Sequence, residues 1–118
     1  MSWTVELHDA FDAEFESLPQ SVQDAIAAAS LLLAEYGPSL GRPHADTLAG
    51  SRHANMKELR FRAEDGAWRV AFAFDPERRA ILLVAGDKAG VAQKRFYKGL
   101  IARADSRFDD HLASMEKR

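Results

Sequence analysis

The segment from Arg60 to Tyr97 contains a set of side chains suited to holding a phosphodiester group. Arginine fits phosphate because its planar guanidinium donates two parallel hydrogen bonds, and tyrosine can stack on a base or donate a proton. A reaction at phosphorus needs cations around the charged transition state, together with a base and an acid. We therefore take this segment as the candidate site. Its cationic and phenolic residues are Arg60, Arg62, Arg69, Lys88, Lys94, Arg95 and Tyr97.

The charges are divided unevenly along the chain. The first 41 residues contain seven Asp or Glu and no Lys or Arg, so all 16 basic residues lie after them. The net charge of -2 and the pI near 6.1 argue against a protein that coats long nucleic acids, because that task needs many uncompensated cations. A localised basic cleft in the second half of the chain agrees with both numbers.

The hydrophobic pattern predicts a β-hairpin that carries the arginines. Residues 57–63 and 68–74 alternate between apolar and polar side chains, and a Glu-Asp-Gly turn lies between them. The alternation places Arg69 on the same face of the hairpin as Arg60 or Arg62. The opposite face carries the large apolar residues and is expected to face the core.

Periodicity and turn residues predict the remaining elements. We expect a strand at 3–7, a helix capped by Asp9, a second helix from about 19 to 36, a buried strand at 81–85 and a helix from about 93 onward. Residues 39–52 are rich in Gly, Pro and polar residues and are expected to form a surface loop anchored by Leu40 and Leu48. The predicted fold class is α+β in the order β-α-α-β-β-β-α, with an antiparallel sheet and helices on one of its faces.

Four motifs occur in this order: Lys57-Glu58-Leu59-Arg60, Trp68-Arg69-Val70-Ala71-Phe72, Ile81-Leu82-Leu83-Val84-Ala85-Gly86-Asp87-Lys88 and Lys94-Arg95-Phe96-Tyr97. With these motifs and this order of elements, the chain resembles the RelE/ParE superfamily of bacterial toxin-antitoxin toxins, and in particular its HigB-like, phage-derived branch. The resemblance implies a RelE-like microbial RNase fold with an N-terminal helical hairpin and a C-terminal helix. It also implies a toxin that cleaves mRNA on the ribosome without a metal or cofactor and that a cognate antitoxin neutralises.

The resemblance also implies roles for individual residues. Arg69 matches the family's arginine on the second hairpin strand, and Lys88 matches a basic residue just after the central strand. Tyr97, or in its place Phe96, matches the family's C-terminal tyrosine. The well-known members carry Lys where this chain has Glu58, so Glu58 either accepts the 2′-hydroxyl proton itself or only pairs with an Arg. The expected catalytic set is Arg69, Arg60, Lys88, Tyr97 and Glu58.

These residues also have ordinary structural interpretations. The three hairpin arginines can lie on a solvated face crossed by Arg to Glu pairs worth about 0 to 1 kcal/mol each. Lys94, Arg95 and Lys98 oppose the dipole of the predicted helix, which favours a nearby phosphate, but a solvated helix face explains them as well. His53 is either a general acid or base, or an exposed loop residue.

We expect no metal site and no cofactor. The four His show no i,i+4 pairing, and the chain contains no Cys. The polar residues near the C-terminus resemble a ligand cluster, but the charged face of an amphipathic helix explains them better. They are Asp105, Asp109, Asp110 and His111.

Length and composition predict a single domain that spans residues 1–118. The absence of Cys suits a reducing compartment. The longest apolar run is about half of the roughly 20 residues needed to span a bilayer, and the N-terminus lacks a signal-peptide pattern. We therefore expect a cytoplasmic protein without membrane contact.

Three functions are open on this fold. An mRNA endonuclease toxin requires the set of Arg69, Lys88 and Tyr97. A ParE-like poison of DNA gyrase has the same fold without that set, and a non-catalytic domain keeps the fold only to bind a partner. The residues present favour the endonuclease, whose partners are expected to be a cognate antitoxin, mRNA and the ribosome.

Overall fold

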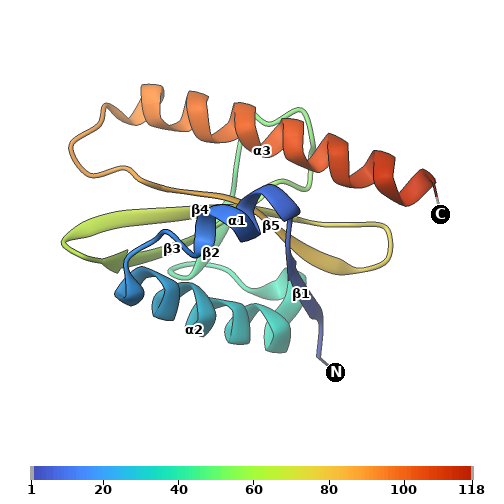
Figure 1. Cartoon of the computed structure of the whole chain (residues 1–118), viewed down its shortest axis with the longest axis horizontal. Helices are drawn as coiled ribbons and strands as arrows, with labels where there is room; N and C mark the ends of the chain where they lie inside the picture. The colour runs from blue at the N-terminus through green and yellow to red at the C-terminus, as the bar shows by residue number, and fades with distance from the viewer. Residues whose placement is uncertain (1, 118) are drawn as a thin grey trace.

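The structure is a computed structural model that describes residues 2–117 (Figure 1). Its strands are β1 (Thr4–Leu7), β2 (Ala45–Thr47), β3 (Lys57–Ala63), β4 (Gly66–Phe74) and β5 (Arg79–Asp87). Its helices are α1 (Asp9–Phe15), α2 (Gln20–Tyr36) and α3 (Gln93–Glu116), with a 3₁₀ turn at Gly37–Ser39. The predicted α+β order of elements is confirmed, and β2 is an addition to it.

The strands form one mixed sheet in the order β1-β5-β4-β3-β2. Neighbours among β2 to β5 are antiparallel, whereas β1 pairs in parallel with β5 and places Val5 opposite Ala80. The predicted antiparallel sheet is therefore right for four strands and wrong for the first. Two helices separate β1 from the next strand, so its pairing is not restricted to the antiparallel return of a hairpin.

Residues 39–52 are more ordered than the surface loop that their composition predicts. Both expected anchors, Leu40 and Leu48, are buried. Between them β2 pairs with β3 and places the buried Ala45 opposite Leu59. The loop prediction is wrong for β2, because a three-residue strand is too short for alternation to be visible in a sequence.

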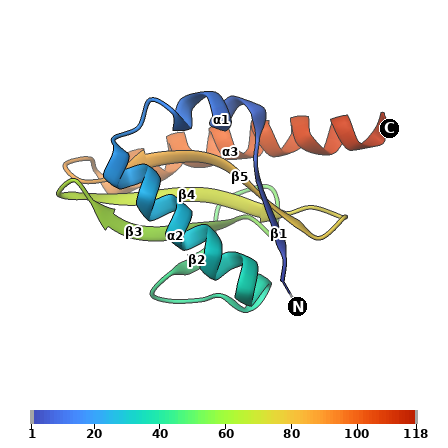
Figure 2. The ribbon, with the colours of Figure 1, turned by 60° about the horizontal axis from the view of Figure 1, so that its bottom comes forward.

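Helices cover both faces of the sheet (Figures 1 and 2), so the prediction of helices on one face is wrong. On one face, Phe11 of α1 and Ile26 of α2 belong to a core that includes Leu82. On the other face, Phe108 of α3 belongs to a second core that includes Ala71. The second face of β4 presents small alanines, and an alternating Ala does not reveal whether a helix covers it.

Strand β5 lies between these two cores. Ala80 and Leu82 belong to the core under α1 and α2, whereas Ile81 and Leu83 belong to the core under α3. A strand that is covered on both faces needs apolar residues at consecutive positions. The uniformly apolar sequence therefore predicted this central strand correctly.

The helix ends follow local chemistry. The N-cap of α1 is His8, whose Nδ1 accepts a hydrogen bond from the backbone N–H of Ala10 at 3.1 Å, and not the predicted Asp9. Helix α2 ends at Gly37, whose φ of 57° favours glycine and where a β-carbon would collide with the indole of Trp3. Within residues 2–117, no helix combines the length and the apolar composition that crossing a membrane requires.

The loop between β2 and β3 is fastened to the middle of α3. Ser51 Oγ donates a hydrogen bond to the buried carboxylate of Asp105 at 2.5 Å, and the backbone N–H of Arg52 donates to the same carboxylate at 3.2 Å. The side chains of Arg52 and His53 both bind the carboxylate of Asp109. We refer to these five residues as the loop clamp. It fixes the position of the loop relative to α3.

Candidate functional site

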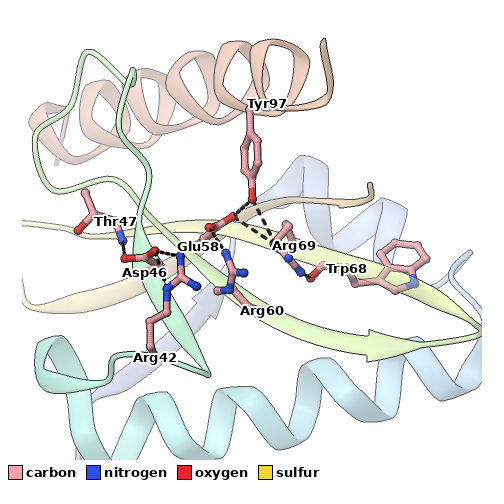
Figure 3. Close-up of polar contacts among 8 residues, drawn as sticks. All are labelled: Arg42, Asp46, Thr47, Glu58, Arg60, Trp68, Arg69 and Tyr97. Carbon is pink, nitrogen blue, oxygen red and sulfur yellow. Dashed lines mark hydrogen bonds and ion pairs between the residues drawn. The ribbon is translucent and has the colours of Figure 1, made fainter. Parts of the chain in front are cut away.

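Glu58 lies at the centre of a hydrogen-bonded cluster on the sheet face that α3 covers (Figure 3). The residue is only 3% exposed. The hydroxyl of Tyr97 donates to its Oε1 at 2.8 Å, and Nη1 of Arg60 donates to its Oε2 at 2.9 Å. Tyr97 comes from the second turn of α3 and points down onto the strands. Each carboxylate oxygen of Glu58 therefore already has one donor.

Arg69 completes this cluster. Its Nε donates to the hydroxyl of Tyr97 at 3.2 Å and lies 3.7 Å from Oε1 of Glu58, while its Nη1 donates to the carbonyl of Trp68 at 2.9 Å. Arg69 lies directly opposite Arg60 in the β3–β4 register, as the hairpin pattern predicted. The carboxylate of Glu58 offsets the repulsion between these two cations. We refer to Glu58, Arg60, Arg69 and Tyr97 as the Glu58 cluster.

Tyr97 is held in its protonated form. Burial raises the pKa of its phenol above the ordinary value of 10.0, the hydrogen bond to Glu58 raises it further, and Arg69 acts in the opposite direction. The phenol is therefore a hydrogen-bond donor at neutral pH. It is placed between a carboxylate that accepts its proton and a guanidinium that donates to its oxygen.

A pocket of about 200 Å³ reaches the Glu58 cluster, and Glu58, Arg60 and Tyr97 line it. The facing wall is β2 with the residues on either side of it. There Arg42 Nη2 pairs with Asp46 Oδ2 at 2.7 Å. The pocket is therefore lined by two carboxylates, a phenol and two guanidinium groups.

A second pocket, of about 430 Å³, lies on the other side of Arg60. His44, Arg62 and Arg69 are in its wall. Because Arg60 lines both pockets, the two adjoin at this residue. Arg62 is exposed and forms no ion pair within the described part of the chain, so its guanidinium is available to an anion.

The structure does not bring every predicted site residue together. Lys88 follows β5 directly, and its side chain forms no hydrogen bond or ion pair among residues 2–117. Lys94 and Arg95 are exposed in the first turn of α3. Phe96 packs in the core under α3, with its ring 5.1 Å from that of Tyr97. Tyr97, and not Phe96, is therefore the aromatic residue that reaches the Glu58 cluster.

His53 and the C-terminal acidic residues serve the fold. His53 belongs to the loop clamp, and its ring lies edge-on against Phe108 with centroids 5.0 Å apart. Two further pairs are His8 with Asp110 at 2.9 Å and His111 with Asp75 at 2.8 Å. Across residues 2–117, no group of three or more His, Cys, Asp or Glu is placed to hold a metal ion.

Sequence reasoning missed Arg42, Asp46 and Gln93, which line the pocket at the Glu58 cluster. The first two lie beside or within β2, a strand that the sequence does not reveal. Gln93 begins α3, is exposed, and has no side-chain hydrogen bond within the described range. In the sequence, only the position of Gln93 at the start of a predicted helix, close to Lys94 and Tyr97, suggested that it could belong to the site.

The Glu58 cluster contains the groups that a phosphodiester reaction requires. A carboxylate accepts a proton, a phenol donates one, and guanidinium groups stabilise the negative charge that develops around phosphorus. Arginine holds such a charge well because its hydrogen bonds to phosphate are charge-assisted and paired. The cluster is thus equipped for acid-base chemistry at a phosphate.

Comparison with known proteins gives relatives for this chain. The sequence profile of the family described as phage derived protein Gp49-like matches residues 13–109. A Mycobacterium tuberculosis protein named as the toxin HigB2 is 42% identical over 117 residues, which is 98% of this chain and 57% of HigB2. A protein of the same organism named as the toxin HigB3 is 45% identical over 100 residues, which is 85% of each chain. The chain thus spans little more than half of HigB2 and most of HigB3.

A solved structure supports the fold. A mutant of the E. coli toxin RelE in the free state superimposes with a TM-score of 0.61 over 86% of this chain and 96% of the RelE chain, at 13% identity. At that identity the likeness shows the fold alone, and it confirms the predicted RelE-like architecture. The family profile covers most of the chain, and HigB3 matches over most of its length. The chain therefore belongs to the phage-derived Gp49-like family, and its predicted resemblance to HigB-type toxins with a RelE-like fold is confirmed.

Proposed function

We propose that this chain is the toxin of a toxin-antitoxin module and that it cleaves mRNA at the Glu58 cluster without a metal ion. Membership of the Gp49-like family, two relatives named as toxins and a RelE-like fold support the toxin assignment. A fold does not determine its chemistry, since related folds carry unrelated functions. The proposal of RNA cleavage therefore rests on the site.

The observation that carries the proposal is the contact of a buried carboxylate with one phenol and two arginines beside a pocket. Glu58 accepts hydrogen bonds from Tyr97 at 2.8 Å and Arg60 at 2.9 Å, and Arg69 lies 3.7 Å away. The pocket gives a ligand access to Glu58, Arg60 and Tyr97. A purely structural ion pair has no need of such a pocket.

The reaction we propose is attack of an RNA 2′-hydroxyl on the neighbouring phosphorus. Glu58 accepts the proton of the 2′-hydroxyl as the new oxygen-phosphorus bond forms, and Arg60 and Arg69 stabilise the charge on the phosphorane. The bond to the 5′-oxygen then breaks, and Tyr97 gives its proton to that oxygen. The products are a 2′,3′-cyclic phosphate and a 5′-hydroxyl, so atoms and protons balance once Glu58 returns its proton to Tyr97.

Substrate can reach the carboxylate without breaking the cluster. A carboxylate has about four lone-pair positions, and Glu58 uses two of them for Tyr97 and Arg60. A 2′-hydroxyl that enters the pocket can donate to a remaining position. This differs from the well-known members of the superfamily, which carry Lys at the position of Glu58.

Induced expression in a bacterium, followed by mapping of new mRNA ends, tests this proposal. We predict that the wild type arrests growth and cuts mRNA, and that Tyr97→Phe lowers the cleavage rate by about 10² to 10⁴, because it removes the proton donor and keeps the ring. Tyr36→Phe is the matched control, since Tyr36 is 51% exposed on α2. It should cut mRNA at the wild-type rate.

Two outcomes would contradict the proposal. Growth arrest with intact mRNA and accumulated gyrase-linked DNA breaks would assign the chain to the gyrase poisons. Full mRNA cleavage by a correctly folded Tyr97→Phe variant would remove the Glu58 cluster from the reaction.

The proposal includes two macromolecular partners besides mRNA. A toxin of this type requires a cognate antitoxin, and co-expression of the protein encoded beside its gene should restore growth. The ribosome is the expected place of action, so the tagged chain should sediment with ribosomes from lysates. Growth arrest that persists when the neighbouring protein is co-expressed would show that this protein is not the antitoxin. A chain that never sediments with ribosomes would contradict the ribosome as its place of action.

A further inference from the structure

A pocket of about 770 Å³ lies between the loop after β2 and the first turns of α3. Its apolar walls are Ala49 and Gly50 from the loop, and Ile101 and Ala102 from the helix. Gly50 has a φ of 102°, and a β-carbon there would lie 3.6 Å from Cδ1 of Ile101. The two walls are therefore close to each other, and the backbone conformation of Gly50 is one that glycine favours.

This pocket adjoins the pocket at the Glu58 cluster. Ala49, Gln93 and Tyr97 line both. The hydroxyl of Tyr97 binds Glu58, while its ring forms part of the apolar pocket. A nucleotide next to a phosphate held by Arg60 therefore has an apolar surface within reach.

The rim of this pocket is cationic. Lys94 and Lys98 both line it, one turn apart on α3, and neither forms an ion pair among residues 2–117. Cations in the first turns of a helix oppose its dipole. An RNA backbone that crosses the rim would offset this unfavourable placement. An acidic peptide with an apolar side chain would match the same lysines and walls, but RNA also places a phosphate against the arginines of the adjoining Glu58 cluster.

Gln93 stands at the boundary between the two pockets. Its side chain is exposed and makes no hydrogen bond within the described residues, so its amide is free to bind a ligand. An amide side chain offers one acceptor and two donors, and Gln pairs with the edge of a base in this way. A base stacked in the apolar pocket would place its edge beside such a group.

The loop wall is fixed before any ligand arrives. Ser51 and Arg52 of the loop clamp follow Ala49 and Gly50 directly, and they bind the buried Asp105 of α3. A pocket whose walls are held in place loses little conformational entropy on binding.

From these observations we infer that this pocket binds the nucleobase next to the scissile phosphate and that Gln93 reads the edge of that base. The inference rests on the proposed endonuclease function and extends it to a determinant of specificity. Stacking on Tyr97 and the apolar walls supplies the affinity, and the Gln93 amide supplies discrimination between bases.

Two variants and two readouts test the inference. Ala102→Phe fills the pocket from an exposed helix position, and Gln93→Ala removes the amide. Ala113→Phe and Gln20→Ala are matched controls at exposed positions outside the pocket. The first readout is the base preference beside mapped mRNA cuts. The second is binding of a mixed-sequence 2′-O-methyl RNA hexanucleotide, which lacks the attacking hydroxyl, to the purified chain.

We expect Gln93→Ala to reduce the base preference beside the cut by roughly tenfold, since one specific amide-base contact is lost. We expect Ala102→Phe to weaken binding of the hexanucleotide at least about fivefold, because a stacking surface is filled. Both controls should match the wild type in both readouts.

The possible failures are distinguishable. If the wild type cuts mRNA while both variants keep its base preference and hexanucleotide affinity, the nucleobase pocket is wrong and the endonuclease stands. If the wild type cuts no mRNA but Ala102→Phe still weakens hexanucleotide binding, the pocket stands as an RNA site and the endonuclease is wrong. If Ala102→Phe abolishes only neutralisation by the co-expressed neighbouring protein, the pocket is a protein dock and the inference is overturned.

Discussion

Arg69 belongs both to the candidate site and to the protein interior. Its side chain is 8% exposed, and it donates hydrogen bonds to the hydroxyl of Tyr97 and the carbonyl of Trp68. It also lies 3.7 Å from the buried carboxylate of Glu58. Removal of the guanidinium leaves the hydroxyl of Tyr97 and the carbonyl of Trp68 without this donor, while Arg60 remains paired with Glu58. Arg69 therefore contributes to stability in addition to its proposed role in phosphate binding.

We predict that Arg69→Ala lowers the free energy of unfolding by about 1 to 3 kcal/mol, the cost of buried acceptors that lose their donor. Chemical denaturation followed by circular dichroism measures this change. Arg62→Ala is the control, because Arg62 is exposed on the neighbouring strand, and its effect should stay within about 0.5 kcal/mol. An Arg69→Ala protein as stable as the wild type would show that the guanidinium is not part of a buried network.

Strand alternation alone gives a different expectation for Arg69. It predicts an arginine that points into an open cleft, whose removal leaves stability unchanged. The pattern identified the correct face of β4 but contains no information on what covers that face. The neighbouring Trp68 lies on the opposite face of the strand and is only partly buried.

The ionisation of Tyr97 makes the stability of the fold depend on pH in the alkaline range. Burial raises the pKa of its phenol above 10.0, and the hydrogen bond to Glu58 adds to this. The folded protein therefore holds this proton more tightly than the unfolded chain does. The resulting stability is fully present below the unfolded value and is lost as the pH rises through the folded pKa.

We therefore predict that the Tm difference between the wild type and Tyr97→Phe is constant up to about pH 9 and shrinks above about pH 10. Thermal melts over this range measure it. Tyr36→Phe, at an exposed position, should show no such trend. A Tm difference for Tyr97→Phe that grows with pH would reverse the sign of the linkage and contradict a raised pKa.

The loop clamp holds the loop after β2 against α3 and so positions the candidate site. It ties the loop after β2 to α3, so it fixes one wall of the pockets relative to Tyr97. Asp105 is the buried centre of the clamp and accepts hydrogen bonds from Ser51 Oγ and the backbone N–H of Arg52. Arg52 lowers the pKa of Asp109 by its hydrogen bond, and His53 adds to this, so the second carboxylate of the clamp is ionised at neutral pH.

We predict that Asp105→Ala frees the loop. Hydrogen exchange at the backbone amides of residues 48–56 should accelerate, because the loop loses its anchor on α3, and mRNA cleavage should fall about tenfold or more as the pocket wall moves. Asp24→Ala, at an exposed position on α2, is the control. If loop exchange is unchanged in Asp105→Ala, the clamp does not hold the loop.

At the level of elements, the sequence predicted long periodic segments and failed on short ones. The hairpin, the apolar β5 and α3 have patterns that extend over many residues, so their types were predictable. Strand β2 has only three residues and gives no period. The sequence did not predict that helices cover both faces of the sheet. The alanines of β4 that α3 covers give the same sequence pattern whether they are exposed or buried.

At the scale of the whole molecule, the two helical layers differ in charge. Helices α1 and α2 lie within the first 41 residues, which contain no Lys or Arg, whereas the Glu58 cluster and the lysines of α3 lie on the other face of the sheet. The proposed RNA substrate would therefore be repelled from one face and attracted to the other. The low pI of the whole chain is compatible with this arrangement because the charges are separated in space.

The candidate site was partly predictable from the sequence. The types and spacing of Arg60, Arg69 and Tyr97 identified three residues that the fold brings together, and the family resemblance added Glu58. The resemblance also included Lys88, whose side chain forms no hydrogen bond or ion pair with them among residues 2–117. Gln93 and the β2 residues of the pocket were not predicted, because their position depends on how the loop and α3 meet in space. The catalytic role of the set stays a prediction.

The chemistry of the RNA ends that appear on induced expression is the sharpest test of cleavage at the Glu58 cluster. Attack by a 2′-hydroxyl at the Glu58 cluster predicts new downstream ends with a 5′-hydroxyl and matching upstream ends with a 2′,3′-cyclic phosphate. Both should also form when the purified chain is stripped of divalent metals before it is added to ribosomes and mRNA. New ends that carry a 5′-phosphate, or growth arrest with intact mRNA, would contradict the account.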